Sequence, residues 1–483
     1  MFQDDHPHEE CGVIGVFAPN EDVARMTFFG LYALQHRGQE AAGIAVADGQ
    51  TISMYKGVGL VSQVFTASTM ADLKGHYAIG HNRYSTTGSS LLRNAQPFLI
   101  ETIHGPLALA HNGNLVNSAA LRNELMQQGM GFSSSSDTEV MTMMLARNGG
   151  GSWEERIKTA MKKWMGAYSL VILTRDCVYA VRDPWGFRPL CIGLLPSGGH
   201  AVASETGALQ TLGCEAIRDV KPGEVVSLSN SALKVMQALP SMEPSAMCVF
   251  EHIYFARPDQ TWDGINVHHV RQRLGEELAR EIVHGLSHGL ADEHGQRMAD
   301  VVIPVPDSSV PAAIGFSHVS GIPYNDGFIK NRYVGRTFIE PTDSLRKRGV
   351  ALKFNVIQEN VLDKRVIMID DSIVRGNTMG PLIKLLRNAG AKEVHVAITC
   401  PPIAHPCFMG VDMGRHEDLI AHKRTVDEIC DHVGADSLYY LSVEGMMRAV
   451  QREDGFCQAC FTGQYPIPVN FSNVKTGFER GMK

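Results

Sequence analysis

The sequence lacks the features of membrane and exported proteins. None of its hydrophobic stretches approaches the roughly 20 consecutive apolar residues that span a bilayer. The first ten residues, Met-Phe-Gln-Asp-Asp-His-Pro-His-Glu-Glu, are acidic, whereas a secretory signal begins with basic residues and continues with apolar ones. We therefore expect a cytoplasmic protein without a membrane partner.

An excess of positive charge is also missing. The chain has 44 Lys and Arg against 51 Asp and Glu, which gives a formal net charge of −7. Proteins that bind nucleic acids concentrate Lys and Arg, so this balance argues against a nucleic-acid partner. The composition is otherwise that of a globular protein, and 483 residues are enough for roughly two to four domains.

Cysteine is too sparse for a disulfide scaffold, since ten cysteines are spread over the whole chain. A single cysteine is more often a small buried apolar residue than a functional one, and we interpret Cys400 in that way. Only Cys11 and the Cys457-x-x-Cys460 pair stand in sequence contexts that indicate more.

The two halves of the chain follow different patterns. The first half contains short strands that are apolar on nearly every residue, which is typical of strands covered on both faces. In the second half strands alternate with amphipathic helices, which predicts βαβ units and a parallel sheet. We place the boundary near Pro244. The predicted strands span residues 12–17, 42–46, 77–81, 107–111, 169–174, 178–182, 299–305, 366–369 and 394–398, and the predicted helices residues 137–146, 152–164 and 378–389.

The strongest local signal is the string from Val366 to Thr378. An apolar strand ends in Asp370 and Asp371, and a loop through Gly376 then leads into a helix. Ligands of parallel sheets bind at the carboxyl ends of the strands, and loop amides with a helix N-terminus form a cradle for a phosphate. Two adjacent aspartates alone would also fit a simple helix cap.

The whole string resembles the phosphoribosylpyrophosphate (PRPP) motif of type I phosphoribosyltransferases. The resemblance implies that Asp370 and Asp371 face the ribose hydroxyls and help to hold Mg2+. It implies that the following loop wraps the 5′-phosphate, although many members have Thr where Asn377 stands. The implied phosphate residues are Ser372, Arg375, Gly376, Asn377 and Thr378.

Two more segments fit the same substrate. The strand end at 303–309 places Ser308 where it can meet the diphosphate of PRPP and its metal ion. The segment from Lys330 to Lys353 carries seven basic against two acidic residues in a net acidic protein. A diphosphate leaving group needs such a cationic cover, and in the family this loop closes over PRPP. We expect Lys330 and Arg336 to bind PRPP.

Cys11 follows a ten-residue polar leader. If that leader is removed as a propeptide, Cys11 carries its own base, an α-amino group with a pKa of ~7.7–8.0. Three downstream segments accompany it: Gln35-His-Arg-Gly-Gln-Glu, His81-Asn-Arg-Tyr-Ser-Thr-Thr-Gly, and His111-Asn-Gly-Asn followed by Ser136-Asp-Thr-Glu. Jointly and in this order they resemble the class II, N-terminal nucleophile (Ntn) glutamine amidotransferase domain.

That resemblance implies a role for each residue. Cys11 attacks the glutamine amide carbon, and Asn112 with the backbone N–H of Gly113 forms the oxyanion hole. Arg83 binds the α-carboxylate of glutamine, for which its planar fork is suited, and Asp137 pairs with the α-ammonium group. The thioester is then hydrolysed to glutamate, which leaves free ammonia.

Cys248, Cys407, Cys457 and Cys460 are candidates for one metal site. A Cys-x-x-Cys pair alone suits zinc, iron–sulfur and redox chemistry equally well. The segments around these cysteines resemble those that ligate a [4Fe–4S] cluster in the Bacillus-type iron–sulfur branch of glutamine PRPP amidotransferases. A zinc site with four cysteines and a set of merely buried thiols are the alternatives.

The glutamine PRPP amidotransferase family accounts for both halves, and the resemblance covers roughly residues 11–470. It implies two domains. The first is an α+β unit, an Ntn-hydrolase four-layer αββα sandwich, and the second is an α/β unit, a type I phosphoribosyltransferase domain with a mainly parallel sheet. The expected organisation is a removed propeptide at 1–10, an amidotransferase domain at 11–244, a phosphoribosyltransferase domain at 245–470 and a mobile tail at 471–483.

The family reaction converts PRPP, glutamine and water to 5-phosphoribosylamine, glutamate and diphosphate, and opens purine synthesis. Ammonia passes between the two sites near Tyr84 and Tyr254, and closure of the Lys330 loop couples them. The family is typically a homotetramer inhibited by purine nucleotides. A class II amidotransferase acting on another sugar phosphate and a non-catalytic PRPP sensor are the alternative functions.

Overall fold

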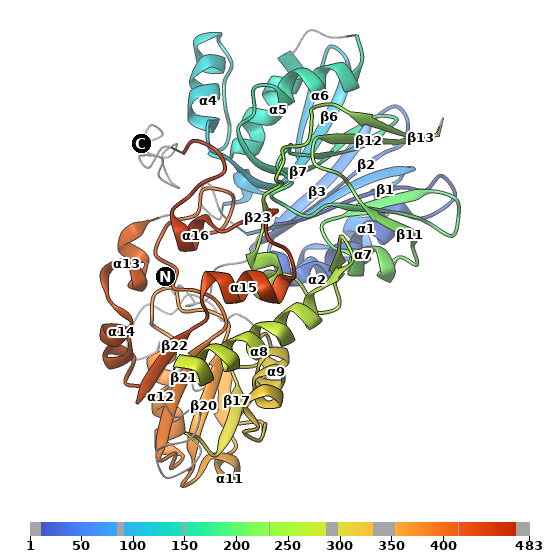
Figure 1. Ribbon diagram of the computed structural model, residues 1–483. Helices are drawn as coiled ribbons and strands as arrows, with labels where there is room; N and C mark the ends of the chain where they lie inside the picture. The colour runs from blue at the N-terminus through green and yellow to red at the C-terminus, as the bar shows by residue number, and fades with distance from the viewer. Residues whose placement is uncertain are drawn as a thin grey trace.

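The computed structural model describes residues 11–84, 91–147, 151–230, 232–285, 298–331, 353–413 and 415–469. Figure 1 shows two parts, one coloured blue to green and built on two sheets, and one coloured yellow to red and built on a single smaller sheet. The α15–α16 region and β23 of the second part lie where the two parts meet.

Two antiparallel sheets form the first part. The first sheet has the order β11-β9-β10-β1-β4-β2-β3, so β1 lies in its middle, and the second has the order β13-β12-β8-β7-β6-β5. Their bounds are β1 (Gly12–Phe17), β2 (Ala41–Ala47), β3 (Ile52–Val58), β4 (Tyr77–Arg83), β5 (Phe98–Thr102), β6 (Gly105–Leu115), β7 (Gly166–Thr174), β8 (Val178–Arg182), β9 (Cys191–Leu194), β10 (His200–Ala203), β11 (Glu215–Asp219), β12 (Glu224–Ser229) and β13 (Ala232–Gln237).

The sheets and helices of this part stack in four layers. One apolar cluster fills the space between the sheets and contains Val13 and Ile79 from the first and Ala110 from the second. Two further clusters join the outer faces of the sheets to helices. The predicted αββα sandwich is therefore confirmed. The helices are α1 (Val23–Ala33), α2 (Val61–Val64), α3 (Ala67–Ala71) and α7 (Thr206–Thr211) on one side, and α4 (Ser118–Gln127), α5 (Asp137–Arg147) and α6 (Trp153–Met161) on the other.

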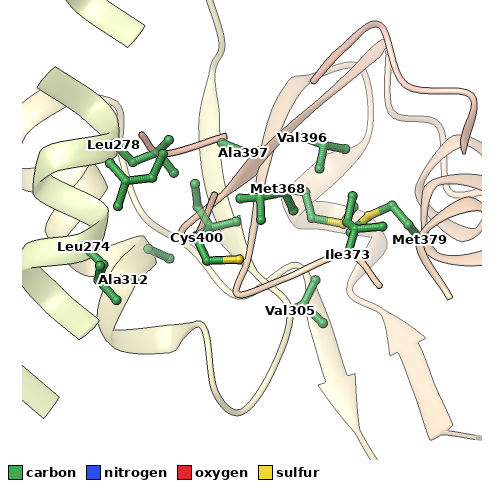
Figure 2. Close-up of a cluster of buried hydrophobic side chains, with 14 of the residues drawn as sticks. Leu274, Leu278, Val305, Ala312, Met368, Ile373, Met379, Val396, Ala397 and Cys400 are labelled. Atoms are coloured by element: carbon green, nitrogen blue, oxygen red, sulfur yellow. The ribbon is translucent and has the colours of Figure 1, made fainter. Parts of the chain in front are cut away.

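The second part is built on a four-stranded sheet in the order β17-β20-β21-β22, in which every pair is parallel. Figure 2 shows Leu274 and Leu278 of α8 on one side of Met368 of β20, and Met379 of α12 on the other. Helices thus cover both faces, as the sequence predicts, and Cys400 is buried in this core. The main elements are β17 (Val301–Pro304), β20 (Arg365–Asp370), β21 (Glu393–Ile398), β22 (Ser437–Tyr440), α8 (Val267–Gly285), α9 (Val310–Ser320), α12 (Met379–Asn388), α14 (Val426–Val433) and α15 (Val443–Val450).

Smaller elements complete the second part. The π-helix η3 (Glu251–Phe255) follows β14 (Met247–Cys248), which pairs in parallel with β23 (Phe456–Cys457) near the end of the chain. The hairpin of β18 (Phe328–Lys330) and β19 (Phe354–Val356) flanks residues 332–352. The remaining elements are β15 (Thr261–Trp262), β16 (Ile265–Asn266), α11 (Gln358–Val361), α13 (Ile420–Lys423), α16 (Ala459–Thr462) and the 3-10 turns η1 (Gln35–Arg37), η2 (Leu92–Asn94) and η4 (His416–Asp418).

Three predicted elements are shorter in the structure than expected. The helix predicted over 378–389 spans Met379–Asn388, with Thr378 and Ala389 as its cap residues. The helix predicted over 152–164 ends at Met161, because Lys163 and Trp164 turn back to the carbonyl of Ala160 before β7 begins. The strand predicted over 299–305 is restricted to Val301–Pro304. In the described part of the chain, no helix is both long and apolar enough to cross a membrane.

Candidate active sites

Three predicted glutamine-site residues point into the space between the two sheets. Side chains alternate along a strand, so Cys11 shares the inner face of β1 with Val13, and Arg83 shares the inner face of β4 with Ile79. By the same alternation Asn112 of β6 lies on the face of Ala110. The strands therefore bring a thiol, a guanidinium and an amide to one end of the intersheet layer.

The thiol of Cys11 is buried and protonated. Its Sγ donates a hydrogen bond to the carbonyl oxygen of Tyr84 at 3.2 Å. Burial raises the pKa of Cys11 to about 11, although that hydrogen bond and the charge of Arg83 act in the opposite direction. Because its surroundings do not ionise it, this thiol needs a base before it can act as a nucleophile.

Asn112 and Gly113 follow Ala110 on β6, and Asn112 shares the intersheet layer with Cys11. Neither the oxygen nor the nitrogen of the buried Asn112 amide has a hydrogen-bond partner among the described residues. Gly113 has φ +141°, and a Cβ there would overlap the carbonyl of Ala167, so the position requires glycine. A buried amide without a partner among the described residues is available to bind a ligand group.

Asp137 begins α5 behind the same strand. Its Oδ2 accepts a hydrogen bond from the backbone N–H of Leu115 at 3.0 Å and lies 3.6 Å from Nδ1 of His111. Burial alone would raise the pKa of Asp137, but His111 and the amides of Leu115 and Thr138 outweigh it and lower that pKa. Asp137 therefore remains a carboxylate at neutral pH and can pair with an ammonium group.

The carboxylates of the PRPP motif lie at the edge of the parallel sheet, where neighbouring strands β17 and β20 both end. Ser308 donates to Oδ2 of Asp371 at 2.6 Å, and Ser309 donates to Oδ1 of Asp370 at 3.2 Å. Ser372 donates to the second oxygen of Asp371 at 2.6 Å. The structure therefore brings both predicted segments together, and their hydroxyl and carboxylate oxygens face one another.

The loop after these carboxylates leads directly into α12. Gly376 has φ +80°, and Thr378 is the N-cap residue of the helix. Arg375 is half-buried and Asn377 is exposed. Lys330, at the end of β18, forms an ion pair with Asp307 at 2.7 Å and so lies beside the Ser308 loop. Arg336 was also predicted to bind PRPP and lies outside the described residues.

The four candidate ligand cysteines lie on adjacent segments. Cys248 and Cys457 face each other in the β14–β23 pair, and the amides of Ala404 and His405 both donate to the carbonyl of Cys460. The pKa of both Cys248 and Cys457 is raised to about 12, chiefly by burial and in part by Cys407. Within the described ranges, however, no group of three or more His, Cys, Asp or Glu side chains is arranged to hold a metal ion.

A group of charged side chains between the two parts was not predicted from the sequence. Arg37 binds Glu205 of the first part and Glu251 of the second, and the three side chains are at most 1% exposed. Arg37 lies in the Gln35–Glu40 segment, and Glu251 lies three residues after Cys248. No pattern in the sequence indicates that they pair, because 214 residues separate them.

The comparisons with known proteins agree with the geometry of both sites. A model described as a glutamine amidotransferase domain matches residues 81–211, and one described as a phosphoribosyl transferase domain matches residues 275–434. In three dimensions the chain is similar to the glutamine PRPP amidotransferase from B. subtilis complexed with ADP and GMP, with 44% identity, a TM-score of 0.87, and coverage of 96% of this chain and 99% of that one.

Curated relatives are similar over nearly their whole length. The amidophosphoribosyltransferase of Synechococcus elongatus is 48% identical over 471 residues, which cover 96% of this chain and 93% of the relative. That of Bacillus subtilis is 45% identical over 468 residues, which cover 96% and 95%. By these similarities the chain belongs to the amidophosphoribosyltransferase family.

Proposed function

We propose that the two sites described above carry the two halves of the amidophosphoribosyltransferase reaction in this chain. The overall reaction converts PRPP, glutamine and water to 5-phosphoribosylamine, glutamate and diphosphate, the first committed step of purine synthesis. One observation carries the residue assignment. A buried thiol shares the intersheet layer with an amide that has no partner among the described residues, and a strand end with two carboxylates before a phosphate-type loop occurs in the same chain. No observation favours a PRPP sensor or another sugar phosphate.

In the first half-reaction Cys11 attacks the amide carbon of glutamine. Removal of residues 1–10 gives Cys11 a free α-amino group whose pKa of ~7.7–8.0 lets it take the thiol proton that burial otherwise retains. Nδ2 of Asn112 and the backbone N–H of Gly113 donate to the oxyanion as it forms. Ammonia leaves, and water then hydrolyses the thioester to glutamate and regenerates the thiol.

Arg83 and Asp137 select and orient glutamine in this proposal. The planar fork of Arg83 matches the α-carboxylate, and the carboxylate of Asp137 matches the α-ammonium group. The lowered pKa of Asp137 supports this role, because the residue remains charged at the pH at which the substrate amine is also charged.

In the second half-reaction ammonia attacks C1 of PRPP as diphosphate leaves. Asp370 and Asp371 accept hydrogen bonds from the ribose hydroxyls, and the loop 372–378 with the N-terminus of α12 holds the 5′-phosphate. Lys330 contributes positive charge at the diphosphate, and we propose the same role for Arg336. Ammonia reaches C1 inside the molecule, past Tyr84 and Tyr254. The backbone carbonyl of Tyr84 accepts a hydrogen bond from the Cys11 thiol, and Tyr254 lies on η3.

The oxygen donors of this site fit Mg2+, which prefers carboxylate, hydroxyl and phosphate oxygens. The hydroxyl of Ser308 and the carboxylate of Asp371 lie 2.6 Å apart, and Ser309 orients Asp370 beside them. Ser308, Asp370 and Asp371 would hold the ion together with PRPP, and a bound ion supplies positive charge against the leaving diphosphate.

We propose that Cys248, Cys407, Cys457 and Cys460 hold a [4Fe–4S] cluster, as in the Bacillus-type branch. Their donor set is the thiolate set that such clusters use. The pKa of Cys460 is raised chiefly by burial and in part by each of Cys248, Cys457 and Cys407, which supports a shared site for the four sulfur atoms. A bound cluster would tie β14, the loop at Cys407 and the β23–α16 segment together.

We further propose regulation and assembly that follow the family. The B. subtilis relative was solved in complex with ADP and GMP, which supports purine nucleotides as feedback inhibitors of this chain. Another similar structure, with 44% identity and a TM-score of 0.89, is described as the allosteric regulatory enzyme of purine biosynthesis. A cytoplasmic homotetramer is the assembly that we propose.

The separation of the two sites can be tested with one substitution in each. Cys11→Ala is expected to abolish phosphoribosylamine formation from glutamine but to leave formation from high concentrations of ammonia, because the acceptor site is intact. Asp371→Ala is expected to abolish both, since both nitrogen sources use the same acceptor. Both rates can be measured as diphosphate release. Loss of the two activities together in Cys11→Ala would contradict the assignment of two sites.

A further inference from the structure

A buried cluster of four charged side chains joins the two parts of the molecule. Nη1 of Arg37 lies 2.6 Å from Oε1 of Glu205, and its Nη2 lies 2.7 Å from Oε1 of Glu251. Arg188 approaches Glu251 to 3.6 Å and donates two hydrogen bonds to the carbonyl of Met409. Two arginines and two glutamates balance in charge, so the cluster can persist out of contact with water.

One member of the cluster also contacts the nucleophile residue. Nε of Arg37 donates a hydrogen bond to the backbone carbonyl of Cys11 at 3.3 Å. This contact orients the peptide group that carries Cys11 Cα, and therefore the direction in which the thiol projects. The guanidinium is rigid and planar, so its position is set by the carboxylates that bind its other nitrogens. Burial would lower the pKa of Arg37, but those carboxylates outweigh it and raise that pKa.

Glu251 itself is firmly attached to the second part. It begins the π-helix η3, and Arg271 of α8 donates to the carbonyls of His252 and Ala256 at the two ends of that turn. Helix α8 packs tightly against α9, and α9 begins directly after the loop of Ser308 and Ser309. Backbone and side-chain contacts thus run without a break from Asp371 to Glu251.

We propose that Glu251 is a positioning residue for Cys11, through which the second part of the molecule holds the nucleophile of the first by way of Arg37. The inference rests on the proposed role of Cys11 as nucleophile. Glu251 touches neither glutamine nor the reacting thiol, and it acts by fixing the guanidinium that binds the Cys11 carbonyl. Glu205 fixes the same guanidinium from within the first part, so Glu251 is the contact that depends on how the two parts meet.

The test is Glu251→Gln in the full-length enzyme, with Thr206→Val as a matched control. Thr206 donates a buried hydrogen bond to Gln260 across the same interface but does not touch Arg37. In Glu251→Gln we expect kcat for glutamine-dependent synthesis to fall by about tenfold or more, with KM for glutamine within about threefold of wild type. The rate at which a diazoketone analogue of glutamine alkylates Cys11 is expected to fall in parallel.

Three comparisons separate positioning from a structural role. Ammonia-dependent synthesis is expected to be unchanged in Glu251→Gln. In Thr206→Val, glutamine-dependent and ammonia-dependent synthesis are both expected to be unchanged. Glu251→Asp keeps the negative charge and is expected to restore part of kcat. It takes the place of Glu251→Gln in the test if Glu251→Gln is unstable. Combining Arg37→Gln with Glu251→Gln is expected to lower kcat no further than Arg37→Gln alone, because both act on one contact.

An unchanged kcat in Glu251→Gln, equal losses of the glutamine- and ammonia-dependent activities, or additive effects of the two substitutions would each overturn the proposal. The proposed function itself would be refuted by a different result, namely glutamine-dependent synthesis retained in Cys11→Ala. That result is independent of the Glu251 variants.

Discussion

The amide of Asn112 is buried between two sheets without a hydrogen-bond partner among the described residues, an arrangement that costs folding energy unless a ligand satisfies it. Its proposed partner is an oxyanion that exists only during the reaction. We therefore expect Asn112→Ala to lower kcat of glutamine-dependent synthesis by about 100- to 1,000-fold, with KM for glutamine nearly unchanged. Steady-state kinetics with glutamine and with ammonia check this.

Asn117→Ala is the control for that substitution. Asn117 lies just after the same strand, but its side chain binds the carbonyl of Lys163 on the surface. It is expected to keep the wild-type kcat. An Asn112→Ala enzyme with wild-type kcat would exclude the amide from the oxyanion hole.

His252 makes the stability of the second part depend on pH. Its ring packs edge-on against Trp262 and Phe456, and neither ring nitrogen has a partner in the described part of the chain. Burial lowers the pKa of His252 to about 4, so the unfolded chain binds a proton more readily than the folded one. The contribution of neutral His252 to the free energy of unfolding is complete above pH ~6.5 and is lost as the pH falls towards 4. The complete loss amounts to roughly 3 kcal/mol.

His252→Phe removes this titration while keeping an aromatic ring between its neighbours. The free energy of unfolding, measured with denaturant between pH 6.5 and 4, is expected to fall less steeply in the variant than in wild type. Equal slopes in the two proteins would show that His252 is not held neutral in the fold.

At the residue scale, individual site residues could be predicted from the sequence, but the residues that they contact could not. Cys11, Arg83 and Asn112 could be named because the motifs that contain them, in this order, resemble those of class II glutamine amidotransferases. The Arg37–Glu251 pair could not be predicted, since an ion pair between residues 214 apart depends on how two separately folded parts meet. The orphaned amide of Asn112 is likewise visible only once its neighbours are in place.

At the scale of elements, helices α8 and α9 show how packing supports the PRPP site. A Cβ at Gly275 would overlap the carbonyl of Ala312, and one at Gly315 would overlap that of Gln272. The two helices approach this closely because both residues are glycine. Since α9 follows the Ser308 loop, separation of the helices would displace a hydroxyl that binds Asp371.

Gly275→Ala is therefore expected to lower the free energy of unfolding by about 1–3 kcal/mol and to reduce synthesis with either nitrogen source. Denaturant unfolding and ammonia-dependent rates measure the two effects. Gly131→Ala adds the same methyl group where no heavy atom lies within 4 Å, so it is expected to leave both unchanged. Wild-type behaviour of Gly275→Ala would show that the helices can separate without consequence.

The elements themselves were predictable where hydrophobic periodicity decides them. The strand 12–17 is observed with the same bounds, and the helix predicted over 137–146 extends by one residue. Helix α6 ends earlier than predicted, because the periodic pattern continues into a turn that hydrogen bonds to Ala160 impose. Its end depends on backbone geometry, which apolar spacing does not encode.

At the scale of the whole molecule, the four cysteines join the beginning and the end of the second part. Cys407→Ala is expected to remove the iron from protein purified without air, which wild type should hold at about four atoms per chain together with sulfide. Cys400→Ala is the control, since Cys400 is buried in the sheet core and is not one of the four candidate ligands. One zinc per chain in wild type, or iron retained by Cys407→Ala, would contradict the cluster assignment.

The central claim is that nitrogen released at Cys11 reaches the ribose carbon inside the molecule. It is tested most directly by supplying glutamine labelled with 15N in its amide, together with PRPP, Mg2+ and excess unlabelled ammonium at a pH where little ammonia is free. Phosphoribosylamine is expected to carry the 15N label of glutamine. A product whose nitrogen has the isotopic composition of the ammonium in solution would contradict it.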